Sequence, residues 1–287
     1  MVFITKPLSA GLYFVATPIG NARDITLRAL DILASADVLA AEDTRSLRRL
    51  MEMHGVPVSG RQIIAYHDHN GAQARPRLLA ALAAGQSVAY ASEAGTPLVA
   101  DPGFVLGRDA LAAGHVVTSA PGPSAVVAAL SISGLPSDRF LFAGFPPAAQ
   151  GARLRAFAEF RDLKATLGFY ESPKRVHRTL AELSEAYGPH RPAAVCRELT
   201  KHFEEVIRGT LGDLVERLEG QTLKGEIVIL VGYAEGAAPD AADIETELDE
   251  ALARVSVKDA AAEIAAKHGL KKRDVYQMAL ARQSKGD

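Results

Sequence analysis

The chain has 287 residues, of which 48% are hydrophobic and 23% are charged, and its formal net charge is -2. This composition is typical of a folded globular protein, and the length allows two or three compact units. A charge so close to zero gives no overall attraction to nucleic acid, so a polyanion would have to be bound by local basic patches. The single cysteine, Cys196, excludes an internal disulfide and favours a reducing, cytoplasmic location.

The N-terminal stretch LSAGLYFVATPIG has some features of a secretory leader, but Ser9, Gly11 and Pro18 interrupt it. No apolar run reaches the roughly 18 residues that a membrane-spanning helix needs. We therefore expect neither a leader nor a membrane partner.

Short apolar runs alternate with segments of helical period from residue 11 onward. LYFVA is followed by the helical segment DITLRALDILASA, then by DVLAA and the helical segment SLRRLMEMHG. This alternation predicts an α/β fold with largely parallel strands, because each crossover helix has to cover a face of the sheet. Further strands are predicted at residues 62–66, 87–91, 116–119, 140–145, 165–170, 193–197, 205–208 and 226–231. Their number exceeds one ordinary sheet, so we expect two α/β lobes with a cleft between them.

Two breaks in this pattern suggest domain boundaries. PGPSA, at residues 121–125, stops a strand with two prolines around a glycine and offers Ser124 as a cap for the next helix. AEGAAPDAAD, at residues 234–243, has no apolar periodicity and the composition of a flexible linker. We expect an N-terminal lobe over residues 1–120, a C-terminal lobe over 121–234 and a small helical domain over 240–287.

This tail is helical throughout in its pattern. Ser256 with Asp259 predicts a helix N-terminus, and Gly269 predicts a stop before a last helix, so three short helices resemble a helix-turn-helix. Residues 271–287 contain five basic and two acidic residues. Two interpretations stay open: nucleic-acid contact, or a solvated helix that packs Val275 and Met278 inward.

Three turn-rich loops follow predicted strands: TPIGN at residues 17–21, SEAGTP at 92–97, and PGPSA. Ligands of open α/β sheets bind beyond the carboxyl ends of the strands, so we expect these loops to converge on one ligand. None has the spacing of a phosphate-binding loop. Glu93 would favour an amine, a sulfonium or ribose hydroxyls, and its alternative role is to stabilise the turn.

The neighbours His67, Asp68 and His69 suggest a metal site, but adjacent ligands on one loop do not easily face one ion. We favour a loop that positions RNA or closes the cleft, and we predict no metal.

A collinear series of motifs is more specific than any one of them. It consists of TPIGN, AEDTR, YHDHN, SEAGTPLVADPG, PGPSA, SGLP, FAGFPP, FYESPKR, RELTK and KGE. Over residues 11–232 the chain resembles the ribosomal RNA small-subunit methyltransferase I family, within the tetrapyrrole-methylase-like superfamily, and its tail resembles that family's helical extension. One difference is that the family usually has Asp where this chain has Glu93, which puts that residue's direct contact in doubt.

The resemblance implies two α/β lobes with S-adenosylmethionine between them, a homodimer, and methyl transfer to the ribose 2′-hydroxyl of a cytidine in the decoding region of 16S ribosomal RNA. It also implies a set of cofactor-binding residues, each of which could instead be only a turn residue: Pro18, Gly20, Glu93, Gly95, Thr96, Ser124, Ala125 and Tyr170.

Catalysis and RNA binding are assigned within the same motifs. In methyl transfer, alignment of the nucleophile, the methyl carbon and the leaving sulfur supplies much of the rate enhancement, so a general base is optional. If there is a base, the candidates are Glu171 and a Lys201 of lowered pKa, with Asp43 third. Lys201 could instead contact a phosphate, and Glu171 could pair with Arg175. Tyr66 and Tyr170 are candidates for stacking on a base. The candidate RNA-binding residues, which could also form surface ion pairs, are Arg45, Lys174, Arg175, Arg197, Lys271, Lys272 and Arg273.

Two rival functions stay open: a methyltransferase for a small tetrapyrrole, and a non-catalytic RNA-binding factor. The basic tail argues against the first, because a porphyrin-like substrate gives no reason for it. The three cleft loops argue against the second, because a scaffold does not need Gly and Pro at every strand end.

Overall fold

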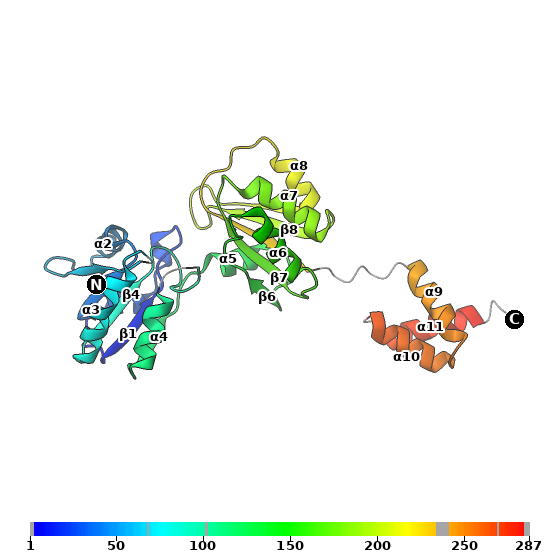
Figure 1. Cartoon of the computed structure of the whole chain (residues 1–287), viewed down its shortest axis with the longest axis horizontal. Coiled ribbons are helices and arrows are strands. Elements are labelled where there is room, and N and C mark those ends of the chain that lie inside the picture. The colour runs from blue at the N-terminus through cyan, green and yellow to red at the C-terminus, as the bar shows by residue number, and fades with distance from the viewer. Residues whose placement is uncertain (1–2, 68, 101–102, 234–240, 269, 284–287) are drawn as a thin grey trace. The chain divides into compact units, whose positions relative to one another are not determined.

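In the computed structural model of the chain, residues 3–67, 69–100, 103–233, 241–268 and 270–283 are described. The chain divides into two compact units, residues 1–232 and 233–287 (Figure 1). Most of the predicted linker, as well as Asp68 and Gly269, lies outside the described residues. The division of the larger unit into lobes at residue 120 stays our proposal.

The first sheet of the larger unit is entirely parallel, as the βα alternation predicts. Its strand order is β3-β2-β4-β1-β5. The strands are β1 (Gly11–Val15), β2 (Val38–Ala41), β3 (Ile63–Ala65), β4 (Ser87–Ala91) and β5 (Val117–Ala120).

Helices cover both faces of this sheet, because its strands carry apolar residues on both sides. Val15 belongs to the same buried cluster as residues of α1 and α2, whereas Leu12 and Phe14 belong to the cluster of α3 and α4. The helices are α1 (Leu27–Ser35), α2 (Thr44–Met53), α3 (Gly71–Ala83) and α4 (Phe104–Ala112), with a short 3₁₀ turn η1 (Ala22–Asp24) before α1.

The adjacent strands β1 and β4 form a topological switch point. From β1 the chain passes through α1 to β2, and from β4 it passes through α4 to β5, on the opposite face and toward the opposite edge. The loops after the two strands therefore diverge and leave a crevice at the carboxyl edge of the sheet.

The second sheet is mainly antiparallel, so the expectation of largely parallel strands was wrong for it. Its order is β6-β7-β10-β8-β9, and only β6 and β7 are parallel. The short segment between β8 and β9 cannot return a parallel strand, which needs a crossover of about a dozen residues or more. The strands are β6 (Phe140–Phe142), β7 (Thr166–Glu171), β8 (Pro192–Arg197), β9 (Glu205–Thr210) and β10 (Ile227–Val231).

The faces of the second sheet are covered unequally. One face packs on α5 (Ala125–Ser133) and on Ile19, while the other forms a larger cluster with three helices. These are α6 (Gln150–Phe160), α7 (Val176–Tyr187) and α8 (Leu211–Leu218). Cys196 lies on β8 and is buried in the cluster that this face of the sheet forms with α5. Burial raises the pKa of its thiol to about 11, so it is a packing residue.

The smaller unit is a three-helix cluster, α9 (Ala241–Leu252), α10 (Val257–His268) and α11 (Lys272–Gln283). Leu248, Ile264 and Val275, one from each helix, meet in its core. The predicted cap of α10 is confirmed, because the backbone N–H of Asp259 donates to Ser256 Oγ at 3.3 Å.

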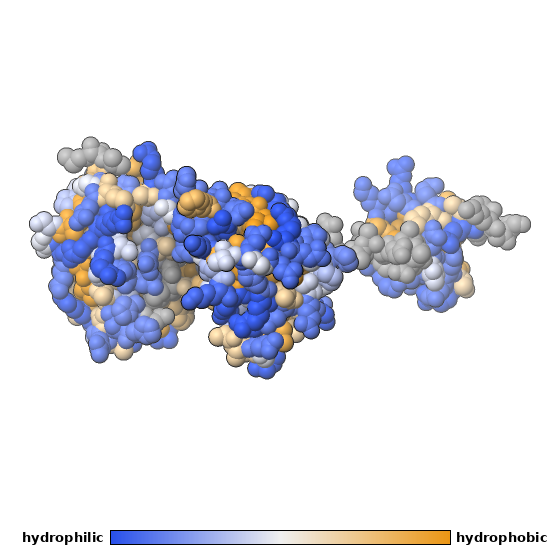
Figure 2. Space-filling view, turned by 90° about the horizontal axis from the view of Figure 1, so that it is seen from above, coloured by the Kyte–Doolittle hydropathy of each residue, from blue (hydrophilic) through white to orange (hydrophobic). Residues whose placement is uncertain are grey.

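The face of the molecule that Figure 2 shows is mainly hydrophilic, and hydrophobic residues form separate patches on it. Among the described residues, no helix is both long enough and apolar enough to cross a bilayer.

A buried ion pair fixes α6 against α7. The side chain of Arg153 is fully buried, and its Nε and Nη2 donate to Glu182 at 2.5 and 2.7 Å. Its Nη1 donates to the carbonyls of Pro147 and Ala148, both at 2.9 Å. The guanidinium is therefore satisfied only while the carboxylate is present.

We predict that Glu182→Gln destabilises the larger unit by about 3–5 kcal/mol, because it leaves a buried guanidinium without its counter-charge. Urea unfolding checks this. The matched control is Glu159→Gln on the exposed side of α6, where we expect a change within about 0.5 kcal/mol. Equal midpoints for the two variants would contradict the prediction.

Candidate functional site

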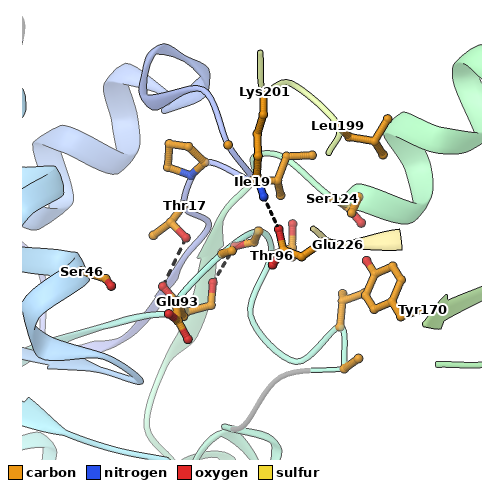
Figure 3. A pocket seen from close by; sticks show the side chains of 18 of the residues that line it. Thr17, Ile19, Ser46, Glu93, Thr96, Ser124, Tyr170, Leu199, Lys201 and Glu226 are labelled. Atoms are coloured by element: carbon orange, nitrogen blue, oxygen red, sulfur yellow. Dashed lines mark hydrogen bonds and ion pairs between the residues drawn. The ribbon is translucent and has the colours of Figure 1, made fainter. Parts of the chain in front are cut away.

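A cavity of about 680 Å³ lies at the carboxyl edge of the first sheet and is also lined by the second sheet's loops. This volume is within the range of small-molecule sites. Loops after β1, β4 and β5 contribute one side, one face of α2 a second, and segments around β7, β8 and β10 a third (Figure 3). The three turn-rich loops therefore meet at one cavity, and a common ligand stays a prediction.

Hydrogen bonds join these loops to one another. Thr17 and Gly95 exchange both backbone hydrogen bonds, at 2.9 and 3.0 Å, as an isolated antiparallel bridge. The hydroxyl of Thr96 donates to the carbonyl of Pro123 at 2.8 Å. Gly95 has a φ of 85°, a conformation that glycine adopts without strain, so this residue type is required at the crossing of the loops.

The 17–21 loop meets the 198–204 loop of the second sheet at van der Waals contact. A Cβ on Gly20 would lie 2.5 Å from Lys201 Cγ and 2.9 Å from the carbonyl oxygen of Leu199. The backbone N–H of Asn21 donates to Thr200 Oγ1 at 3.0 Å. This contact closes one side of the cavity, and only glycine permits it.

Backbone strain is concentrated in two of the cavity's loops. In the described part of the chain, four residues other than glycine have positive φ: Leu98, Ala100, Glu198 and Thr200. Such conformations cost of order 1–3 kcal/mol each and gather at ligand sites. Thr200 is β-branched, for which a φ of 65° is a genuine outlier.

Glu93 gives the cavity an acidic character. Burial, followed by repulsion from Glu42, Asp43 and Glu226, raises the pKa of its carboxyl. Glu42 is held beside it, since its Oε2 accepts the backbone N–H of Glu93 at 3.2 Å. A bound cation would relieve this repulsion, whereas a bound anion would increase it.

Lys201 stays a cation in this site. Burial lowers its pKa, but hydrogen bonds from Nζ to Glu198 and Glu226, both 2.7 Å, outweigh burial and the pKa is raised. The expectation of a lysine with a lowered pKa was therefore wrong, because the ammonium group donates both to Glu198 of its own motif and to Glu226 of the KGE motif. Figure 3 shows the contact with Glu226.

The two other candidate bases already have partners. Glu171 lines the cavity, but its carboxylate accepts from Thr179 Oγ1 at 2.6 Å, from Arg175 and from the N–H of Ser172. Asp43 is not among the lining residues and caps α2 through Arg45 N and Ser46 N. Its hydrogen bonds with Arg45, and then with Ser46, lower the pKa of its carboxyl, which weakens it as a proton acceptor.

All eight residues expected to bind the cofactor line the cavity. They are Pro18, Gly20, Glu93, Gly95, Thr96, Ser124, Ala125 and Tyr170. Ser124 occupies the N-cap position of α5 but makes no capping hydrogen bond, contrary to our expectation. The Tyr170 hydroxyl accepts the backbone N–H of Val126 at 3.3 Å, so its ring is held at the start of α5.

The residues expected to bind RNA are dispersed. Arg45, Lys174, Arg175 and Arg197 do not line the cavity. Lys271, Lys272 and Arg273 are exposed on the separate smaller unit.

Two of these arginines are already paired, Arg175 with Glu171 at 3.0 Å and Arg197 with Glu205 at 2.6 Å. The prediction that Tyr66 stacks on a base was wrong: it is 3% exposed and packs edge-on against Tyr90.

Several lining residues were missed from the sequence, among them Ser46, Arg49, Met53, Phe145 and Glu226. Three of them lie on α2 at a spacing of three and four, which follows the AEDTR motif and could have indicated a helix face. Phe145 belongs to FAGFPP and is 58% exposed at the cavity, where its ring contacts Tyr170 edge-on.

Among the described residues, no three side chains of His, Cys, Asp and Glu are grouped in a way that could hold a metal ion.

Comparison with known proteins assigns the family. The model of the Tetrapyrrole (Corrin/Porphyrin) Methylases matches residues 11–215, and that of the RsmI C-terminal HTH domain matches residues 238–283. A Mesorhizobium japonicum protein named Ribosomal RNA small subunit methyltransferase I is 49% identical over 96% of this chain and 93% of its own length. The chain belongs to the ribosomal RNA small subunit methyltransferase I family.

Further family members also match this chain over nearly its whole length. The Mycobacterium tuberculosis protein of this name is 42% identical over 95% of both chains, and the Pseudomonas aeruginosa protein is 41% identical over 97% of this chain and 100% of its own.

Solved structures share the fold. The methyltransferase CobJ superposes with a TM-score of 0.62 at 20% identity, over 79% of this chain and 95% of its own, and diphthine synthase with 0.59 at 16%, over 77% and 89%. At these identities only the fold follows.

We predict that Gly20→Ala opens the contact between the 17–21 and 198–204 loops, because its Cβ would overlap the backbone of Leu199. Overpacking of this kind costs about 1–3 kcal/mol, so the unfolding midpoint should fall. The control is Gly151→Ala in α6, where the nearest atom would be Arg155 Nη1 at 3.6 Å. Thermal unfolding of both variants measures the difference, and a Gly20→Ala protein as stable as the control would rule out the close contact.

Proposed function

We propose that this chain transfers a methyl group from S-adenosylmethionine to the ribose 2′-hydroxyl of a cytidine in 16S ribosomal RNA. The observation that carries this is the cavity itself, whose lining includes both a carboxylate of raised pKa, Glu93, and the aromatic ring of Tyr170. Family membership supports the ribosomal RNA substrate, since the curated relatives are named for it.

The residues present fit the proposed cofactor. A sulfonium and an amino group are cationic, and the grouping of Glu42, Glu93 and Glu226 favours cations. Gly20 and Gly95 let the loops that line the cavity pack closely on one another, and Ser124 has a hydroxyl that no cap uses. The site lacks the glycine-rich phosphate loop that a nucleotide polyphosphate would require.

When bound, the cofactor supplies an electrophilic methyl group. The chain's own residues then have to align the ribose hydroxyl with that methyl group and exclude water, which is where most of the rate gain of an in-line transfer arises. The loops around the cavity suit this role because hydrogen bonds and close contacts hold them in place.

We propose that no dedicated base is needed. Glu171 and Asp43 are occupied by structural hydrogen bonds, and Lys201 is protonated. The ribose proton can leave to water or to an exposed carboxylate such as Glu226, whose side chain is 74% exposed. Lys201 instead offers a positive charge at the mouth of the cavity.

We further propose a homodimer. Helix α5 is apolar around most of its circumference, yet Val127 is 49% and Ile132 38% exposed. Such a helix is normally buried. The edge strand β5 precedes α5 in the sequence, and its residues Thr118 and Ser119 are exposed. The unpaired edge of a sheet is normally covered. A second copy would cover both.

The match of residues 11–215 to the model of the Tetrapyrrole (Corrin/Porphyrin) Methylases keeps a small tetrapyrrole as the alternative substrate. Mapping of ribose methylation in 16S ribosomal RNA from cells that lack this chain separates the two. The proposal requires one cytidine to lose its 2′-O-methyl group and to regain it on complementation. Unchanged ribosomal RNA would exclude the proposed substrate.

We predict that Glu93→Gln weakens S-adenosylmethionine binding while it stabilises the cofactor-free protein. A raised pKa means that ionised Glu93 disfavours the folded state at every pH above the ordinary pKa of a glutamate. The gain in stability should therefore be present at pH 7 and vanish below about pH 4.5. Calorimetry measures binding and thermal unfolding measures stability.

The control is again Glu159→Gln, for which we expect neither change. In the wild type, cofactor affinity should also fall as the pH is lowered through the raised pKa of Glu93. A Glu93→Gln protein with undiminished affinity would remove the carboxylate from the site.

We predict that deletion of residues 240–287 lowers affinity for ribosomal RNA and flattens its salt dependence, because Lys271, Lys272 and Arg273 are lost. Cofactor binding should persist, because the cavity lies wholly within the larger unit. Filter binding at several salt concentrations provides the measurement. Undiminished RNA affinity would make the smaller unit a structural element instead.

A further inference from the structure

The side of α2 beside the cavity carries Arg45, which the sequence suggested for RNA binding, and Arg49, which it did not. Arg45 and Arg49 are four residues apart, so their side chains lie one above the other on the same helix face. Arg49 lines the cavity together with Ser46 and Met53, and the Arg45 side chain is 91% exposed. Figure 3 shows Ser46 on this helix, at the cavity.

The guanidinium groups on α2 have N–H donors available for a ligand. In the described part of the chain, neither Arg49 nor the neighbouring Arg48 has a carboxylate within ion-pair distance. Arg45 pairs with Asp43 at 3.2 Å, whose other oxygen is occupied in capping the helix. An exposed pair of this kind contributes little to stability.

The position of Arg45 along the helix is unfavourable for folding. Arg45 lies in the first turn of α2, whereas the last turn of this helix contains no basic residue. The N-terminal end of a helix is the positive end of its dipole, so cations are stabilising at the other end. Helix stability therefore does not explain this arrangement, and an anionic ligand would.

Charge is also segregated across the site. Glu42, Glu93 and Glu226 make part of the cavity lining acidic, which suits a cationic donor. Arg49 and Arg45 extend from the lining of the cavity onto the exposed surface of α2. A strand that reaches the cavity over this rim would keep its phosphates on the basic side and present only a ribose to the interior.

We propose that Arg45 and Arg49 bind the phosphodiester backbone of the substrate RNA strand where it enters the cavity. The planar guanidinium fork matches phosphate oxygens in a bidentate way. Such contacts position the strand without reading its sequence. This inference rests on the proposed function and adds to it a surface for the substrate, on the larger unit and independent of the basic tail.

The test compares Arg45→Gln/Arg49→Gln with Arg155→Gln/Arg178→Gln, a control that removes the same charge from exposed positions on α6 and α7. The probe is the small ribosomal subunit purified from cells that lack this chain. Methyl transfer is measured as KM and kcat, subunit binding over a salt series, and S-adenosylmethionine binding by calorimetry. Thermal unfolding verifies that each variant folds.

For Arg45→Gln/Arg49→Gln we expect KM for the subunit to rise by about tenfold at physiological salt. The salt slope should flatten by roughly 0.7 for each phosphate that the variant no longer neutralises. S-adenosylmethionine affinity should be unchanged, and the control should match the wild type in every measurement.

Three results overturn the inference. Wild-type KM and salt slope in the double variant would show that the arginines touch no phosphate. A loss of cofactor affinity with RNA binding intact would assign them to the donor's carboxylate. An equal rise in KM and an equal flattening of the salt slope in the control would show that only the net charge of the protein matters. If the wild type itself methylates no subunit, the proposed function fails, and that outcome is distinct from the other three.

Discussion

The contact between Gly20 and residues 199–201 is the constraint on which the site depends. It is the point where a loop of the parallel sheet touches the hairpin loop of the antiparallel sheet, without room for a single methyl group. Thr200 adopts its strained backbone there, and its hydroxyl accepts the N–H of Asn21. The cost of that strain is offset by the surrounding packing, and the result is a cavity whose sides are held before any ligand arrives.

The electrostatics of the cavity follow from the same geometry. Bringing the β4 loop next to the ends of β2 and β10 gathers Glu93, Glu42 and Glu226 in one place, and the hairpin loop contributes Lys201 between two carboxylates. The result is a cavity with an acidic lining that also carries the ammonium group of Lys201. This arrangement suits a cationic methyl donor, and it explains why a conventional base is hard to find among the residues present.

Much of this site could be predicted from the sequence, for physical reasons. Apolar runs mark strands, and Gly and Pro after β1, β4 and β5 mark loops that meet because parallel strands end at one edge. The direction of β10 could not be predicted, since an apolar run looks the same in either orientation. Nor could the pKa of Lys201, whose partner Glu226 is distant in sequence. Of the arginines of α2, Arg45 was suggested by its motif, whereas Arg49 was missed because it looks like any residue of a solvated helix surface.

A crystal structure of the chain with S-adenosylmethionine tests the central claim most directly. The account predicts that the donor lies between the 17–21 loop and Tyr170, with a cationic group within hydrogen-bonding or ion-pair distance of the Glu93 carboxylate. A donor bound elsewhere, or one whose charged groups leave Glu93 in contact only with water, would contradict it.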